Sequence, residues 1–201
     1  MESPEQKAAY LIDLLNTKGQ GDYIGEPISQ LEHSLRAAHQ AKLNNADDET
    51  VIAALFHDIG QFLPAHEIRS IAHEVQSMNS THDSTAGGVG RVGHERIGEE
   101  YLTRLGFSKK VGFLVGSHVA AKRFLCGIDP AYHDTLSEAS KKSLVFQGGP
   151  MRGDELNEWA ANPWCDEMCQ LRKWDDAAKV VGLETDPANA YEAVIVRLLK
   201  S

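Results

Sequence analysis

Apolar residues recur three and four positions apart along most of this chain, the spacing that places them on one face of an α-helix. Together with cap and stop residues, this pattern predicts helices over the ranges 4–17, 28–43, 49–60, 94–106, 108–126, 134–146, 163–181 and 187–200. The chain shows no convincing alternation of apolar and polar positions, which would indicate strands, and no internal repeat. The pattern therefore predicts an all-α fold.

Three segments interrupt the helical pattern. Residues 18–27 (KGQGDYIGEP) and 148–150 (GGP) carry the Gly and Pro that are typical of turns. Residues 61–92 include NSTHDSTAGG, which predicts a long surface loop, and Gly60 is expected to end the helix before it. Loops of this length in compact domains are often functional lids or disordered segments.

Composition limits the classes of protein to consider. The 201 residues are 42% hydrophobic and 24% charged, which suits one globular domain over residues 1–201. The net charge of −9 disfavours nucleic acid as a partner, because nucleic-acid binding needs clustered Lys and Arg. No apolar stretch approaches the ~18–20 residues that span a bilayer, and the N-terminal residues do not have the pattern of a secretory signal, so we expect none. Three cysteines are too few for a disulfide framework, so we expect a cytoplasmic protein without a membrane partner.

Histidine and aspartate side chains follow one another along the predicted helices. Imidazole and carboxylate together suit iron, zinc or manganese. The candidate ligands number too many for one tetrahedral zinc and suit two metals that share a carboxylate; they are His33, His57, Asp58, His94, His118 and Asp175. Adjacent helical residues point about 100° apart, so His57 and Asp58 can converge on a metal only at a helix end. The other histidines lack matching partners and are expected to have no metal role; they are His39, His66, His73, His82 and His133.

Two cationic residues share helical faces with candidate ligands. Lys122 lies four residues after His118, and Arg172 lies three residues before Asp175. Cations beside two metals indicate a multiply charged anionic substrate such as a phosphate or phosphonate. The alternative is that both side chains are solvated ends of amphipathic helices.

A set of ordered motifs resembles the HD-domain superfamily, which folds as a helical bundle. The motifs are HSLRAAHQA, ALFHDIG, VGHERIG, SHVAAKRFL and RKWDDAAK. Within it, the chain is similar to the mixed-valent di-iron oxygenases. The similarity is closest to the dioxygenases of 2-amino-1-hydroxyethylphosphonate and its N-trimethylated relative, and more distant to myo-inositol oxygenase. The resemblance extends over residues 22–179. The HD dipeptide alone is weak evidence, whereas the full ordered set is specific.

The resemblance implies a ligand set for an Fe(II)/Fe(III) pair that uses dioxygen as co-substrate. One iron would bind His33, His57, Asp58 and Asp175. The second would bind His94, His118 and the other oxygen of Asp58. Asp176 is the alternative to Asp175 as the last ligand. Asp175 is preferred because the family's ligand follows an aromatic residue, and here Asp175 follows Trp174.

The resemblance also implies roles around the metals. Tyr23 and Glu26, in the motif DYIGE, would cover the site without substrate and move aside when it binds. Lys122, Ser140 and Arg172 match positions that hold the phosphonate. Gln61 stands where the family pattern has His, beside the same substrate site, so it bears on the choice of substrate.

The implied reaction is oxidative cleavage of a carbon–phosphorus bond. The candidate substrates are 1-hydroxy-2-(trimethylammonio)ethylphosphonate, which would give glycine betaine, and 2-amino-1-hydroxyethylphosphonate, which would give glycine. The small polar residues at 76–93 favour the trimethylated substrate. The main alternative is a metal-dependent phosphohydrolase of a nucleotide or phosphate ester, and the third is an inactive regulatory module. His94, His118 and the DYIGE motif favour the oxygenase, and the oligomeric state stays open.

Overall fold

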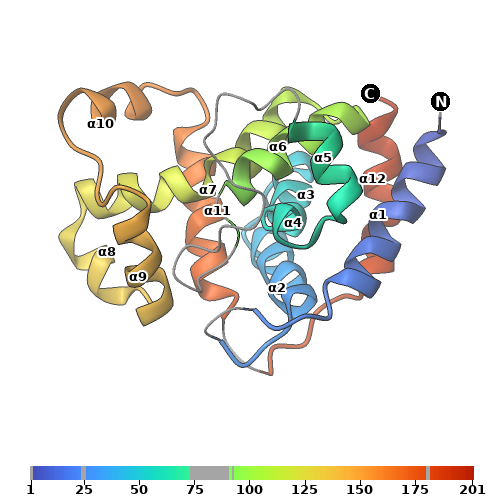
Figure 1. Ribbon diagram of the computed structural model, residues 1–201, viewed down its shortest axis with the longest axis horizontal. Coiled ribbons are helices and arrows are strands. Elements are labelled where there is room, and N and C mark those ends of the chain that lie inside the picture. Colours follow the sequence, from blue (N-terminus) through green and yellow to red (C-terminus); the bar gives the residue numbers. More distant parts are fainter. Residues whose placement is uncertain (1, 24–25, 73–90, 92, 180–181) are drawn as a thin grey trace.

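A computed structural model describes residues 2–23, 26–72, 91, 93–179 and 182–201 (Figure 1). These residues fold into the helices α1 (Pro4–Lys18), α2 (Gln30–Leu43), α3 (Asp48–Phe56), α4 (Ile59–Phe62), α5 (Ala65–Ala72), α6 (His94–Leu105), α7 (Lys109–Ile128), α8 (Pro130–Thr135), α9 (Glu138–Phe146), α10 (Gly153–Ala160), α11 (Cys165–Ala177), the 3₁₀ helix η1 (Ala188–Tyr191) and α12 (Glu192–Leu199). The described residues form no β-strand, and β-type pairing among them is limited to isolated bridges such as that between Asp22 and Ser29. The prediction of an all-α fold is confirmed.

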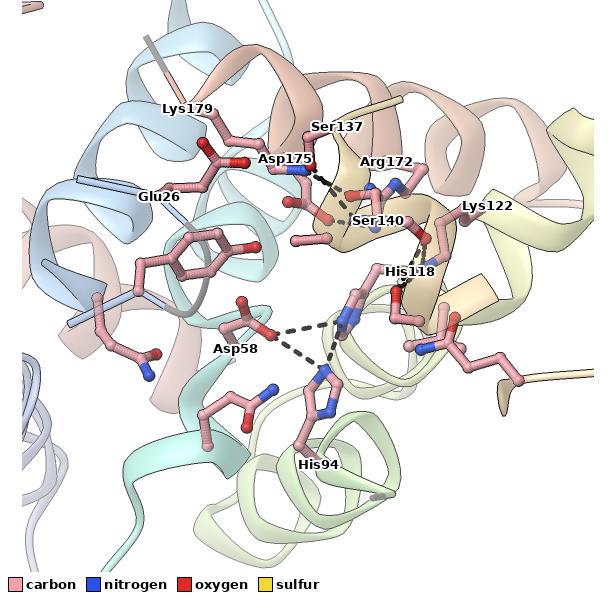
Figure 2. Close-up of a pocket in the computed structure, with 17 residues that line it drawn as sticks. Glu26, Asp58, His94, His118, Lys122, Ser137, Ser140, Arg172, Asp175 and Lys179 are labelled. Carbon is pink, nitrogen blue, oxygen red and sulfur yellow. Dashed lines mark hydrogen bonds and ion pairs between the residues drawn. The ribbon is translucent and has the colours of Figure 1, made fainter. Parts of the chain in front are cut away.

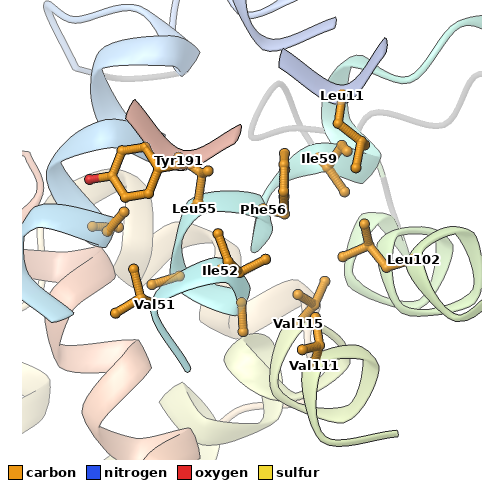
Figure 3. Close-up of a cluster of buried hydrophobic side chains, with 14 of the residues drawn as sticks. Leu11, Val51, Ile52, Leu55, Phe56, Ile59, Leu102, Val111, Val115 and Tyr191 are labelled. Carbon is orange, nitrogen blue, oxygen red and sulfur yellow. The ribbon is translucent and has the colours of Figure 1, made fainter. Parts of the chain in front are cut away.

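Helix α3 lies at the centre of the bundle. Its residues from Thr50 to Phe56 are all buried, and it packs against α2, α7, α11 and α12. Figure 3 shows Ile52, Leu55 and Phe56 among apolar side chains from the neighbouring helices. Asp47 caps the helix by accepting a hydrogen bond from the Thr50 amide. Because α3 ends at Phe56, His57 and Asp58 follow it in the middle of the fold.

Residue Gly60 was expected to end the preceding helix, and this prediction is wrong. Gly60 lies inside the short helix α4. A Cβ atom on Gly60 would lie 2.0 Å from the carbonyl oxygen of His94, so the glycine is needed for close packing of α4 on α6. This contact fixes the start of α6 beside the end of α3.

The first part of the predicted loop 61–92 is also helical. Helix α5 carries Ile68 and Ile71 on the face that packs towards the core. Residues 73–90 and 92, which include His73 and His82 and most of the stretch 76–93, lie outside the described residues. The predicted loop 61–92 therefore begins too early, because α4 and α5 occupy most of residues 61–72.

Helix α7 corrects the expectation about apolar stretches. It has 20 residues and is long and apolar enough to cross a membrane by length and composition alone. The most apolar 18-residue segment of this helix is 61% buried inside the protein, and the helix packs on α3, α6 and α11. Helix α7 is therefore a core helix that carries His118 and Lys122 in its buried face.

Helices α8, α9 and α10 gather around one end of α7 and α11 (Figure 1). Two small clusters hold this group; their buried members are Phe124, Leu125, Met151 and Cys169 in one, and Cys126, Leu136 and Leu144 in the other. The predicted single helix 134–146 is wrong, because the chain turns at Leu136 and Ser137 caps α9. Helix α10 was not predicted. The three cysteines are free thiols.

Candidate metal centre

The first cluster of candidate ligands joins helices α2 and α11 to the end of α3. The Nε2 atom of His33 lies 3.0 Å from Nε2 of His57 and 3.1 Å from Oδ1 of Asp175. Oδ2 of Asp58 lies 3.8 Å from His33 Nε2 and 3.5 Å from His57 Nε2. All four side chains are buried.

The second cluster joins α6 and α7 to the same aspartate. The Nε2 atoms of His94 and His118 lie 3.0 Å apart, and they are 3.1 and 3.5 Å from Oδ1 of Asp58 (Figure 2). Asp58 therefore presents one carboxylate oxygen to each histidine pair. The structure brings together all six residues that the sequence singled out as ligands, on five different segments.

The spacing of the donor atoms fits metal ions. A metal–nitrogen bond of about 2.1 Å puts neighbouring ligand atoms of an octahedral ion about 3.0 Å apart and opposite ones about 4.2 Å apart. The separations in both clusters, 3.0 to 3.9 Å, fall inside this interval. Oδ1 of Asp175 is buried and has no hydrogen-bond partner, as expected of an atom that a cation would satisfy.

Backbone contacts orient three of the histidines. The Nδ1 atoms of His57, His94 and His118 each lie 2.8 Å from the carbonyl oxygen three residues earlier. When Nδ1 donates to that oxygen, the neutral ring keeps its lone pair on Nε2, which is the atom that faces the cluster. The ring of His33 is held differently: Tyr23 stacks on it with 3.8 Å between ring centroids.

The electrostatics of the clusters suit metal ligands. Burial alone would raise the pKa of Asp58, but the nearby His57, His118 and His94 outweigh it and hold that pKa well below its usual range. Burial is likewise outweighed at Asp175, whose pKa is held low by Arg172 and by the nearby imidazole of His33. Burial lowers the pKa of His33 and of His118, whereas at His94 the carboxylate of Asp58 outweighs burial and raises the pKa to about 9, so a metal would have to displace a proton there. Charged carboxylates and neutral imidazoles are the forms that bind metals.

Asp175 and Asp176 have different surroundings. Asp175 faces His33, and its Oδ2 forms an ion pair with Nη1 of Arg172 at 2.6 Å. Asp176 points to the other side of α11, where Arg172, Lys179 and Tyr132 all donate to it. The carboxylate of Asp176 is thus fully engaged away from the cluster, and Asp175 is the residue that could bind a metal.

A pocket of about 610 Å³, its mouth included, opens beside both clusters (Figure 2). The predicted substrate-site residues all line it; they are Tyr23, Glu26, Gln61, Lys122, Ser140 and Arg172. Lys122 is buried, and its Nζ donates to Ser143 Oγ at 2.6 Å. Burial, together with the charges of Arg172 and Lys179, lowers the pKa of Lys122 to about 7. The pocket thus places cationic donors within reach of an anion beside the metal clusters.

Other residues of the pocket were missed by sequence reasoning. Ser143 and Lys179 line it, and Tyr132 and Asp176 hold Arg172 from behind. Ser143 lies three residues after Ser140, and Lys179 lies four residues after Asp175, so helical spacing from known site residues could have found both. The side chains of His66 and His133 are 70% and 44% exposed, and His39 belongs to neither metal cluster, as expected for histidines without a metal role.

Comparison with known proteins identifies the family of this chain. The HD domain family model matches residues 31–137, which is more than half of the chain. The chain belongs to the HD-domain family. This HD-domain protein is 36% identical over 199 residues to hydroxymethylphosphonate dioxygenase of Gimesia maris, covering 99% of this chain and 91% of that protein.

Two further relatives match over similar lengths. One is (1-hydroxy-2-(trimethylamino)ethyl)phosphonate dioxygenase, the glycine-betaine-forming enzyme of Leisingera caerulea, which is 34% identical over 92% of this chain and 87% of its own length. The other is an uncharacterised protein of Acanthamoeba polyphaga mimivirus, which is 33% identical over 99% of this chain and 84% of its own length. The resemblance of this HD-domain protein to the phosphonate dioxygenases is confirmed.

Proposed function

We propose that this protein is a di-iron oxygenase that cleaves the carbon–phosphorus bond of a 1-hydroxyalkylphosphonate. The observation that carries the proposal is the position of a cationic pocket directly beside two histidine–aspartate clusters that share Asp58. The names of two relatives support it, because both are phosphonate dioxygenases. The proposed ligand set is the six residues of the two clusters, and the metal would supply redox chemistry with dioxygen.

The proposed reaction balances without a further reductant. A 1-hydroxyalkylphosphonate dianion and dioxygen give a carboxylate, hydrogen phosphate and one proton. The carbon–phosphorus bond breaks, the hydroxyl-bearing carbon is oxidised to the carboxylate, and dioxygen is fully reduced. Both oxygen atoms that the products gain come from dioxygen.

The residues of the pocket would bind and orient the phosphonate. Lys122 and Ser140 face the space next to the second cluster (Figure 2). Gln61 accepts a hydrogen bond from the Arg91 amide at 2.8 Å through Oε1, which orients its side-chain amide so that Nε2 can donate to a substrate oxygen. Arg172 would contribute mainly by holding Asp175, because two carboxylates already occupy its donors.

The tail of the substrate would face Glu26 and Gln30. No ion pair of the Glu26 carboxylate is found with any residue that the structure describes, and Oε1 of Gln30 is buried without a hydrogen-bond partner. Two such acceptors favour a tail that donates hydrogen bonds, such as a primary ammonium, over a trimethylammonium, which cannot donate. We therefore propose 2-amino-1-hydroxyethylphosphonate as the preferred substrate. The opposite preference drawn from residues 76–93 rests largely on residues outside the described part of the chain.

One assay tests the proposal. Iron-loaded protein would be given hydroxymethylphosphonate, 2-amino-1-hydroxyethylphosphonate and the trimethylated compound, and phosphate release would be followed with and without oxygen. We expect oxygen-dependent release, fastest from the aminated substrate. Release from no phosphonate, with oxygen-independent hydrolysis of a phosphate ester, would support the phosphohydrolase instead.

A further inference from the structure

Lys179 lines the pocket, and its side chain contacts Ser140, which also lines the pocket. It follows the last turn of α11, its side chain is only 11% exposed, and its Nζ donates to Ser140 Oγ at 2.9 Å. Figure 2 shows it reaching past Asp175 to Ser140. Its second contact is with Oδ1 of Asp176 at 3.1 Å.

The contact with Lys179 determines what Ser140 can do. An ammonium has donors only, so Ser140 Oγ must accept from it and keep its own proton free to donate. Ser140 is 7% exposed, and within the described chain its hydroxyl donates to no residue. The amide of Ser140 donates to Ser137 Oγ, which fixes the backbone at the start of α9.

Ser143 lies one helical turn further along α9, and its hydroxyl, unlike that of Ser140, has no free proton. Its Oγ accepts from Lys122 at 2.6 Å, and its hydroxyl donates to the Ser140 carbonyl oxygen at 3.0 Å. Both functions of that hydroxyl are therefore used inside the protein. Of the two serines, Ser140 is the one with a proton left for a ligand in the pocket.

We propose that Lys179 is a positioning residue that makes the Ser140 hydroxyl a hydrogen-bond donor to the anionic group of the substrate. This inference rests on the proposed function. A second way for Lys179 to act would be through its charge alone. Asp176 lies against the ammonium and offsets much of that charge, so the orientation of Ser140 is the larger effect.

A double-mutant cycle separates these two modes of action. The variants are Lys179→Met, Ser140→Ala and their combination, with Lys173→Met as the control, because Lys173 is exposed on α11. For the iron-loaded proteins we would measure kcat, KM for the aminated phosphonate, iron content and the inhibition constant of inorganic phosphate. We expect Lys179→Met to raise KM and the phosphate inhibition constant about tenfold to a hundredfold, the effect of one hydrogen bond to a charged group, with kcat and iron content nearly unchanged.

The combined variant carries the decisive readout. If Lys179 acts through Ser140, the combined variant has the KM of Ser140→Ala alone, and Lys179→Arg recovers part of the wild-type value. A KM equal to that of the wild type in Lys179→Met, or a combined effect equal to the product of the single effects, would overturn the inference while the proposed function stands. An unfolded Lys179→Met would shift the test to Lys179→Arg and Lys179→Gln, which keep a donor. Wild-type protein that turns over no phosphonate would overturn both.

Discussion

Arg172 and Asp175, one turn apart on α11, form an ion pair at the edge of the first metal cluster. Nη1 of Arg172 lies 2.6 Å from Oδ2 of Asp175, while Oδ1 lies 3.1 Å from Nε2 of His33. The guanidinium thus occupies one oxygen of the carboxylate and leaves the other to the cluster. Partners of this kind fix the orientation and charge of a metal ligand, and their loss commonly costs tenfold to a hundredfold in metal affinity, roughly.

Replacing Arg172 should therefore affect the metal as well as the substrate. In Arg172→Met we expect iron to fall from two towards one per chain, together with a higher KM for the phosphonate. Iron content by elemental analysis and steady-state kinetics check this, with Arg197→Met as the control, because Arg197 pairs with Asp48 at the surface. Two retained irons with an unchanged KM would contradict the role.

Asp58 is the one residue shared by both clusters. Asp58→Ala should abolish binding of both metals and all turnover. His118→Ala removes a ligand of the second cluster only, so this variant should still bind metal at the first cluster. Metal content after dialysis distinguishes the two variants. Asp134→Ala is a suitable control, since the Asp134 side chain is 86% exposed. Retention of two irons by Asp58→Ala would show that the carboxylate does not bridge.

Gly60 holds helix α4 against the first residue of α6. In Gly60→Ala the added Cβ would meet His94 backbone atoms at 2.0 and 2.8 Å, so α6 must shift and move the His94 ring. We expect a loss of about 1–3 kcal/mol in the free energy of unfolding, the usual effect of overpacking, and weaker metal binding at the second cluster. Denaturant unfolding and metal titration measure both. Gly21→Ala is the matched control, because nothing lies within 4 Å of its new Cβ.

Lys122 should make substrate binding depend on pH. Its pKa of about 7 in the free protein means that the amine is charged below pH 7 and neutral above it. An anion binds the charged form, so KM should rise with pH above 7, by roughly tenfold for each further unit in the limit of one required proton. Lys122→Arg stays charged and should show a flatter profile. Ionisation of the substrate affects both proteins equally, and identical profiles would exclude Lys122 as the titrating group.

The helices with strong signals were predictable from the sequence. Ser29 and Glu32 form a capping box that begins α2, and Ser108 caps α7, so these starts follow from local chemistry. Helix α10 was missed because it is short and begins soon after a Gly–Gly–Pro turn, although Leu156 and Trp159 have helical spacing. The average composition of residues 61–92 predicts a loop, because its Ser, Thr and Gly outweigh the few apolar residues with helical spacing in α5.

The sequence alone could indicate which residues are candidate metal ligands, but it could not show that they come together in the fold. Nothing in the spacing of His33 and Asp175 along the chain indicates that α2 and α11 lie side by side, which results from the packing of both on α3. The choice of Asp175 over Asp176 depends on which face of α11 meets His33 and which face meets Tyr132. The contact between Lys179 and Ser140 joins residues 39 positions apart and is likewise a product of tertiary structure.

The most direct test of the central claim is the source of the oxygen atoms in the products. Iron-loaded protein would turn over 2-amino-1-hydroxyethylphosphonate under isotopically labelled dioxygen in ordinary water, and mass spectrometry would follow glycine and phosphate. Oxidative cleavage predicts label from dioxygen in the products, with one dioxygen consumed per phosphate released. Products that carry oxygen from water alone, formed equally well without dioxygen, would contradict the account and indicate hydrolysis.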